Sequence, residues 1–189
     1  AERGAVVVPA FDDEHIIAGQ GTVGLELVRE AEALGAALDL VLCPVGGGGL
    51  IAGSSVAIKT LSPKTQIWGV EPAAFDDARR SLEAGSRQTL KAAHRSLCDA
   101  LESPALGELT WPIIQRSLAG VVAVTDEEVA EAMRYAFQTL KLVVEPGGVV
   151  GLAALLSGKL SLDGRTAGLV LSGGNVDPEL FVKVLRGEL

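Results

Sequence analysis

One segment of the chain reads Cys43-Pro44-Val45-Gly46-Gly47-Gly48-Gly49-Leu50-Ile51-Ala52-Gly53-Ser54, and it predicts a strand, a glycine loop and a helix in direct succession. The apolar run 38–45 leads into the four glycines, and residues 50–61 follow with apolar or small side chains at helical spacing. Each glycine costs roughly 0.5–1 kcal/mol relative to alanine, because it loses more conformational freedom on folding. We therefore expect four in a row only where something approaches the backbone too closely for a side chain.

The glycine loop is interpreted as a binding site for phosphate. N–H groups at the start of a helix lack partners and lie at the positive end of the helix dipole, so they bind anions. A flexible surface loop is the alternative, although linkers seldom join an apolar strand directly to an apolar helix. The P-loop pattern is excluded because no lysine follows Gly49, and the dinucleotide pattern GxGxxG is matched only loosely, with Glu71 as its acidic residue. Glycine content alone cannot choose the ligand.

The composition is typical of one globular domain. Of 189 residues, 48% are hydrophobic and 21% are charged, which excludes disorder, and the net charge of −8 argues against nucleic acid or an anionic membrane as a partner. No apolar run reaches the roughly 18 residues needed to span a bilayer, and no signal peptide opens the chain. Two cysteines, Cys43 and Cys98, make no disulfide framework, so we expect a cytoplasmic location.

Alternating strand and helix patterns predict an α/β fold, a parallel twisted sheet with helices on both faces. Strands are predicted at 6–8, 38–45, 66–70, 121–124 and 166–171, the third ending before Glu71-Pro72 because proline cannot continue a ladder. Helices are predicted at 23–34 with Thr22 as N-cap, 50–61, 73–84, 111–118, 126–140 after a capping box, 147–156, and from Asp177-Pro178 onward. Residues 86–112 are predicted to be mainly loop.

A second glycine turn, Ser172-Gly173-Gly174-Asn175, also follows a predicted strand. In open parallel sheets, ligands lie beyond the carboxyl ends of the strands. Both glycine turns are therefore expected to face one shared ligand.

Five segments, taken in this order, resemble the fold-type II pyridoxal-phosphate enzymes, specifically the branch of threonine/serine dehydratases and serine racemases. They cover nearly the whole chain and are Phe11-Asp12-Asp13 with residues 17–22, Pro44 to Leu50, Val70-Glu71-Pro72 with Asp76-Asp77, Lys141 to Pro146, and Leu171 to Asn175. The resemblance implies that 1–189 is a pyridoxal-phosphate-binding large domain.

The resemblance also names a cofactor, pyridoxal 5'-phosphate, and the residues that bind it: Gly46, Gly47, Gly48, Gly49, Leu50, Glu145 and Ser172. It implies that the glycine loop binds the phosphate through backbone N–H groups and that the hydroxyl of Ser172 bonds the pyridine nitrogen. A neutral hydroxyl does not keep that nitrogen protonated as a carboxylate would, which favours β-elimination. Glu145 matches a glutamate near the cofactor; its alternative is a carboxylate in a turn before Pro146.

The racemase-like members of this family bind a divalent cation through two carboxylates and a main-chain carbonyl. The matching residues here are Glu71, Asp77 and the carbonyl of Phe75. Hard oxygen ligands of this kind suit Mg²⁺ or Ca²⁺. The alternative is an acidic helix start exposed to water, which the helix dipole also favours.

Two departures from the family pattern bear on function. Many relatives carry Ala-Asp-Gly where this chain has Cys98-Asp99-Ala100, and the methyl group of Ala100 is expected to narrow the space over the cofactor ring. The Schiff-base lysine of the family lies in a Ser-x-Lys-x-Arg-Gly segment, N-terminal to the part matched here. All the lysines of this chain lie in other contexts: Lys59, Lys64, Lys91, Lys141, Lys159 and Lys183. We therefore expect a partial domain without its first elements or the small domain, and no catalytic residue in this chain.

The resemblance implies a parent lyase that deaminates threonine or serine to a 2-oxo acid and ammonia by β-elimination of the hydroxyl group. Serine racemase is the nearest alternative, and a non-catalytic module that binds pyridoxal phosphate or another ligand is a second. A nucleotide-binding α/β domain is the third and weakest alternative. The expected partners are a small hydroxy amino acid and further copies of this chain, because truncation edges and the apolar helix 149–156 are expected to be exposed.

Overall fold

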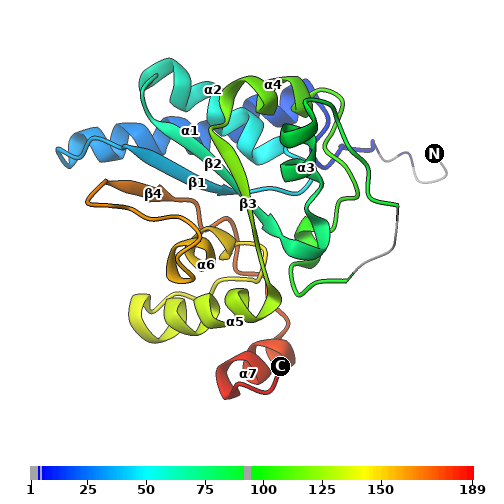
Figure 1. Cartoon of the computed structure of the whole chain (residues 1–189), viewed down its shortest axis with the longest axis vertical. Coiled ribbons are helices and arrows are strands. Elements are labelled where there is room, and N and C mark those ends of the chain that lie inside the picture. The colour runs from blue at the N-terminus through cyan, green and yellow to red at the C-terminus, as the bar shows by residue number, and fades with distance from the viewer. Residues whose placement is uncertain (1–3, 5, 92–94) are drawn as a thin grey trace.

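The computed structural model describes residues 4, 6–91 and 95–189, and a four-stranded parallel sheet forms its centre (Figure 1). The strands are β1 (Leu40–Pro44), β2 (Gln66–Pro72), β3 (Gly120–Val124) and β4 (Ala167–Leu169). Their order is β3-β2-β1-β4, and every pairing is parallel. The predicted α/β fold is confirmed, and β1, which carries the glycine loop, lies between β2 and β4.

Helices cover both faces of the sheet (Figure 1). They are α1 (Glu14–Ala33), α2 (Gly49–Leu61), α3 (Asp77–Ala84), α4 (Thr110–Ser117), α5 (Asp126–Tyr135), α6 (Val150–Leu156) and α7 (Pro178–Arg186), with short 3-10 turns η1 (Ala73–Phe75) and η2 (Asp99–Leu101) and a π turn η3 (Ala136–Leu140). Successive residues of β1 face opposite sides of the sheet, as the pleat of a strand requires. Leu40 and Leu42 belong to the core beneath α5 and α6. Val41 and Cys43 belong to the core beneath α1 and α2. Burial on both faces explains why β1 is apolar throughout.

Helices α1 and α2 meet at glycines, so their backbones are in direct contact. A Cβ atom added at Gly53 of α2 would lie 2.7 Å from the backbone nitrogen of Gly21 and would overlap the carbonyl oxygen of Ile17. One added at Gly24 of α1 would lie 2.9 Å from the Cα of Ser54. These glycines therefore set how closely α1 approaches the helix that begins at the glycine loop.

Two predictions at the N-terminal end are wrong. Residues 6–8 form no strand: Val6 and Val7 are 87% and 88% exposed, because none of the strands in the described residues pairs with this β-branched run. Thr22 is not an N-cap, since α1 begins at Glu14 and the carboxylate of Asp13 accepts the N–H groups that cap it. Helix α1 continues through Gly19, Gly21 and Gly24, and the last two of these glycines lie against α2.

Other boundaries shift by a few residues. Strand β2 continues to Pro72, whose neighbour in the register is Val124 of β3, so the prediction that it ends before Glu71 is wrong. The predicted helix 126–140 is divided into α5 and η3, and the helix predicted from 147 begins at Val150. In the described part of 86–112, loop structure is confirmed apart from η2 and the start of α4.

Helix α6 is not the exposed apolar surface that the sequence suggested. Residues 150–154 are buried against α5 and the sheet, because the small side chains of α6 let it pack closely there.

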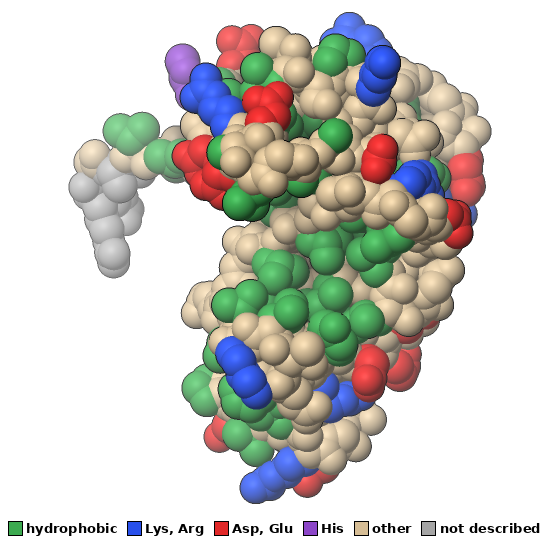
Figure 2. Space-filling view, turned by 90° about the vertical axis from the view of Figure 1, so that its left-hand side faces the viewer, with side chains coloured by type: hydrophobic (Ala, Val, Ile, Leu, Met, Phe, Trp, Pro, Cys, Tyr) green, Lys and Arg blue, Asp and Glu red, His purple; other side chains and the backbone are tan. Residues whose placement is uncertain are grey.

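Figure 2 shows hydrophobic side chains gathered on the lower half of one face. The exposed large hydrophobic residues around η3 are Tyr135, Phe137, Leu140, Leu142 and Val143. Among the described residues, no helix is long and apolar enough to cross a membrane.

Candidate functional site

The glycine loop joins β1 to α2 and presents a row of backbone donors. Gly48 is the N-cap of α2, with φ of 94°, and no side chain caps this helix. In the described part of the chain, the N–H groups of Gly46 to Leu50 donate no hydrogen bond. Unpartnered N–H groups at the start of a 13-residue helix are suited to an anion.

Side chains of the protein itself occupy the space beside each glycine. An added Cβ at Gly46 would lie 3.2 Å from the Cα of Leu101, and one at Gly47 would overlap the ring of Phe11. At Gly48 it would lie 2.9 Å from the hydroxyl oxygen of Thr110. The predicted close approach is real, but protein atoms make it rather than a ligand. The case for an anion therefore rests on the unpartnered N–H groups.

The second glycine turn follows β4, which pairs in parallel with β1, so both turns lie at the same edge of the sheet. Glu145 is held against this turn: its backbone N–H donates to the carbonyl of Gly173 at 3.0 Å, and its Oε2 accepts the N–H of Asn175 at 2.9 Å. Ser172 is exposed, and its hydroxyl makes no hydrogen bond to a described residue. The structure thus brings Glu145 and Ser172 to the sheet edge where β1 ends.

Turn η2 lies between the glycine loop and Gly147, which follows Pro146. Leu101 lies against the positions where Gly46 and Gly147 lack side chains, and Ala100 contacts the same two glycines. The preceding residues are anchored to α5, because Asp126 accepts the Ser96 hydroxyl at 2.6 Å and the N–H of Leu97 at 3.1 Å. The exposed residue Ala100 therefore lies next to the glycine loop, and the predicted effect of its methyl group on the space over the cofactor ring stays a prediction.

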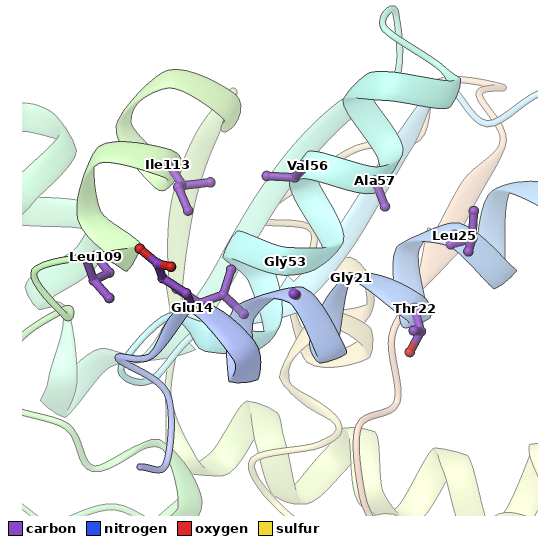
Figure 3. Close-up of a pocket in the computed structure, with 11 residues that line it drawn as sticks. Glu14, Gly21, Thr22, Leu25, Gly53, Val56, Ala57, Leu109 and Ile113 are labelled. Atoms are coloured by element: carbon purple, nitrogen blue, oxygen red, sulfur yellow. The ribbon is translucent and has the colours of Figure 1, made fainter. Parts of the chain in front are cut away.

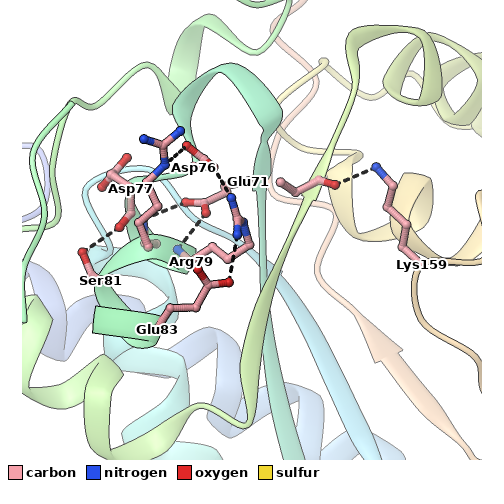
Figure 4. Close-up of polar contacts among 10 residues, drawn as sticks. Glu71, Asp76, Asp77, Arg79, Ser81, Glu83 and Lys159 are labelled. Carbon is pink, nitrogen blue, oxygen red and sulfur yellow. Dashed lines mark hydrogen bonds and ion pairs between the residues drawn. The ribbon is translucent and has the colours of Figure 1, made fainter. Parts of the chain in front are cut away.

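The two acidic residues predicted to bind a metal are buried at the carboxyl end of β2 (Figure 4). Glu71 is 1% exposed and accepts the N–H groups of Ala78 at 3.1 Å and Arg79 at 2.9 Å. Asp77 is 2% exposed, and among the described residues its Oδ2 has no hydrogen-bond partner. Phe75, whose carbonyl completes the predicted ligand set, is buried in η1.

Burial raises the pKa of Glu71 to about 9, even though two N–H groups favour its charged form. Burial, together with the charge of Asp76, raises the pKa of Asp77 to about 7. The nearby guanidinium groups of Arg79 and Arg80 pair with Asp76 instead. Two buried carboxyl groups therefore lack a compensating cation from a described side chain. No cluster of three or more His, Cys, Asp or Glu in the described residues could hold a metal, so a cation here would need main-chain ligands.

A large cavity lies elsewhere in the described part of the chain, between α1, α2 and α4 (Figure 3). It encloses about 560 Å³, and Glu14 is its one ionisable lining residue. Apolar and small side chains line the rest, among them Val56, Leu109 and Ile113. This cavity offers neither paired acid–base groups nor the donors that the glycine loop provides.

Neither cysteine is suited to act as a nucleophile, and three of the lysines have partners elsewhere. Burial raises the pKa of the Cys98 thiol to about 12 and that of the Cys43 thiol further, so neither forms a thiolate readily. The ammonium groups of Lys59, Lys141 and Lys159 donate to nearby carbonyl groups outside the glycine turns.

Sequence reasoning missed the residues that support the glycine loop from outside. Thr110 donates to the carbonyl of Gly47, and Asp12 accepts two N–H groups at the start of α4. These partners are 63 and 96 residues apart in sequence, so no local pattern could have paired them. Asp12 was noted only as part of a family motif.

A family model and several known proteins match this chain. A family model described as "Pyridoxal-phosphate dependent enzyme" matches residues 1–173. The L-threo-3-hydroxyaspartate ammonia-lyase of Saccharomyces cerevisiae is 37% identical over 188 residues, covering 100% of this chain and 56% of that protein. Serine racemase of Arabidopsis thaliana is 39% identical over 181 residues, covering 93% of this chain and 53% of its own length.

Among solved structures, a threonine deaminase from T.th. superposes with a TM-score of 0.84 and 48% identity, covering 88% of this chain and 59% of that one. The chain spans about half the length of the curated relatives it matches. Homologues thus include ammonia-lyases and racemases.

Proposed function

This chain belongs to the pyridoxal-phosphate-dependent enzyme family, and we propose that its glycine loop binds the phosphate group of that cofactor. The observation that carries the proposal is the row of unpartnered N–H groups from Gly46 to Leu50 at the start of α2. Backbone N–H groups at the start of a helix can bind an anion without a lysine or arginine beside them. The absence of side chains on Gly46 to Gly49 lets Leu101, Phe11 and Thr110 pack against the loop.

Ser172 and Glu145 are proposed to contact the cofactor ring. Ser172 has an exposed hydroxyl on the turn beside the glycine loop, suited to donate to a ring nitrogen. Glu145 is fixed by Gly173 and Asn175, so its carboxylate keeps one orientation. When bound, pyridoxal phosphate withdraws electrons from the α-carbon of an amino acid, which allows a hydroxyl on the neighbouring carbon to leave.

The proposed reaction of the whole protein is deamination of threonine or serine, a small 3-hydroxy amino acid, to a 2-oxo acid and ammonia. It is supported by the likeness to a threonine deaminase and to an L-threo-3-hydroxyaspartate ammonia-lyase. Both proteins are named for a 3-hydroxy amino acid. Racemisation of serine is the second candidate, favoured by the likeness to a serine racemase. Ala100, beside the glycine loop, is proposed to restrict which side chain the substrate carries.

Titrating the 189-residue chain with pyridoxal phosphate tests the proposal. We expect a saturable change in the cofactor absorbance band and, after borohydride reduction, no lysine adduct, because the described lysine contacts lie outside the glycine turns. Peptide mass mapping of the reduced sample checks the second point. A stoichiometric adduct on one lysine would show that the anchor lies in this chain, and absence of any binding would count against the phosphate site.

We also propose that Glu71, Asp77 and the main chain at Phe75 bind Mg²⁺ or Ca²⁺. The support is the buried Oδ2 of Asp77 without a partner and the two carboxyl groups without a compensating cation. A divalent cation with oxygen ligands would satisfy both. The N–H groups of Ala78 and Arg79 would hold Glu71 in place for it.

Adding Ca²⁺ at about 100 times its Kd is expected to raise the free energy of unfolding by about 2.7 kcal/mol. Asp77→Asn should abolish this response while leaving the metal-free chain within about 1 kcal/mol of wild-type stability, because it removes a poorly compensated buried charge. Glu83→Gln, an exposed carboxylate on the same helix, is the matched control and should keep the response. Thermal unfolding with and without the ion measures both; an unchanged response in Asp77→Asn contradicts the site.

Self-association and a cytoplasmic location stay predictions from the sequence. The exposed hydrophobic residues around η3 support the first.

A further inference from the structure

The carbonyl of Gly47 points away from the anion site and is held by two donors. The hydroxyl of Thr110 donates to it at 2.8 Å, and the backbone N–H of Gly107 donates at 3.1 Å. Thr110 is fully buried at the first position of α4. A second acceptor for this hydroxyl, the carbonyl of Gly107, lies farther away at 3.4 Å. The contact with Gly47 is therefore the stronger of the two.

We propose that Thr110 is a positioning residue for the phosphate site: by fixing the Gly47 carbonyl, it aims the N–H of Gly48 at the anion. This inference rests on the proposed function of the glycine loop. In a planar trans peptide, the carbonyl of one residue and the N–H of the next point in opposite directions. Donors on the α4 side of the Gly47–Gly48 peptide therefore turn its N–H to the other side, where no described group accepts it.

A glycine loop needs such an external hold, because glycine lets a peptide rotate at little steric cost. Gly48 has φ of 94°, a conformation that only glycine adopts readily. Because glycine has no side chain, Gly48 itself does not hold the Gly47–Gly48 peptide in one orientation. The ring of Phe11 fills the space in which a Gly47 side chain would lie, and it limits how far the loop can move. Phe11 and Thr110 therefore both restrict the loop.

Thr110 is itself placed by a distant carboxylate. Asp12 accepts the N–H of Glu108 at 2.9 Å and that of Leu109 at 2.8 Å, and so holds the two residues that precede α4. Gly107 packs directly against the Asp12 side chain, since a Cβ there would overlap it. The turn that donates to Gly47 is thus tied to the segment that precedes α1.

The test compares the affinity of the purified chain for pyridoxal phosphate with its affinity for pyridoxal, which lacks the phosphate group. Thr110→Val keeps the shape of the side chain but removes the donor, and it is expected to weaken pyridoxal phosphate binding by about fivefold to tenfold while leaving pyridoxal binding unchanged. Thr110→Ser restores a hydroxyl and should bind within about twofold of wild type. The ratio of the two affinities is the readout, because a merely structural defect would weaken both ligands alike.

Thr65→Val is the matched control. Thr65 is equally buried, and its hydroxyl donates to Leu38 at 2.7 Å, away from the glycine loop. The affinity ratio of this variant should equal that of wild type. If wild type binds pyridoxal phosphate and Thr110→Val binds it equally well, the positioning role is refuted while the phosphate site stands. If wild type binds neither pyridoxal phosphate nor inorganic phosphate, the phosphate site and the positioning role are both overturned.

Discussion

Replacing Gly53 with alanine is expected to lower the free energy of unfolding by about 3 kcal/mol, a large fraction of the stability of a domain this size. The added methyl group would overlap the carbonyl of Ile17 and lie 2.7 Å from the backbone nitrogen of Gly21. Backbone atoms cannot rotate away as a flexible side chain can, so α1 and α2 must separate along their contact. Urea unfolding followed by circular dichroism measures the loss.

Gly19→Ala is the matched control on the opposite side of that contact. Gly19 is an exposed residue inside α1, and an added Cβ would meet nothing within 4 Å. Alanine favours a helix interior, so this variant should gain about 0.5–1 kcal/mol. Equal effects of the two substitutions, or a stable Gly53→Ala, would show that the helices are not held at backbone contact.

Gly48→Ala is expected to damage both stability and cofactor binding. At φ of 94° an alanine costs about 1–2 kcal/mol, and its methyl group would lie 2.7 Å from the Cδ1 of Ile114 and 2.9 Å from the hydroxyl oxygen of Thr110. We expect a total loss of about 3 kcal/mol in the free energy of unfolding, and pyridoxal phosphate binding weakened by about tenfold or more because the N–H donors are displaced.

Gly35→Ala is the control that separates the cost of the backbone conformation from the effect on pyridoxal phosphate binding. Gly35 also has positive φ, 71°, but nothing lies within 4 Å of an added Cβ. It should lose only the backbone cost of about 1–2 kcal/mol and keep wild-type affinity for pyridoxal phosphate. Both quantities come from unfolding curves and an absorbance titration. A Gly48→Ala variant that matches Gly35→Ala in affinity would refute a role for the glycine loop in binding.

Local patterns predicted the elements whose signals are contained within a few residues. The capping box at α5 is present, with Thr125 and Glu128 bonded reciprocally, and Asp177 caps α7 as expected. Helix α2 lies within one residue of its predicted start. By contrast, the β-branched residues 6–8 satisfied every local criterion for a strand and failed because no partner strand adjoins them.

The site was predictable where topology alone decides it. Neighbouring parallel strands end at the same edge, so the glycine turns after β1 and β4 were expected together, and they lie together. The reason for the glycines was not predictable, since it depends on Phe11, Leu101 and Thr110, which reach the loop from distant parts of the sequence. Side chains that pack across such distances leave no periodic signal.

The central position of β1 also bears on the order in which the chain folds. Strands β1 and β2, with α2 between them, are close in sequence and form a local unit, whereas Asp39 and Thr166, which join the start of β1 to β4, are 127 residues apart. Contacts between distant segments form slowly because a long loop must close first. During synthesis, the glycine loop is therefore complete long before Ser172 leaves the ribosome. The loop proposed to bind phosphate therefore forms early, and the turn proposed to face the cofactor ring forms only after β4 has been made.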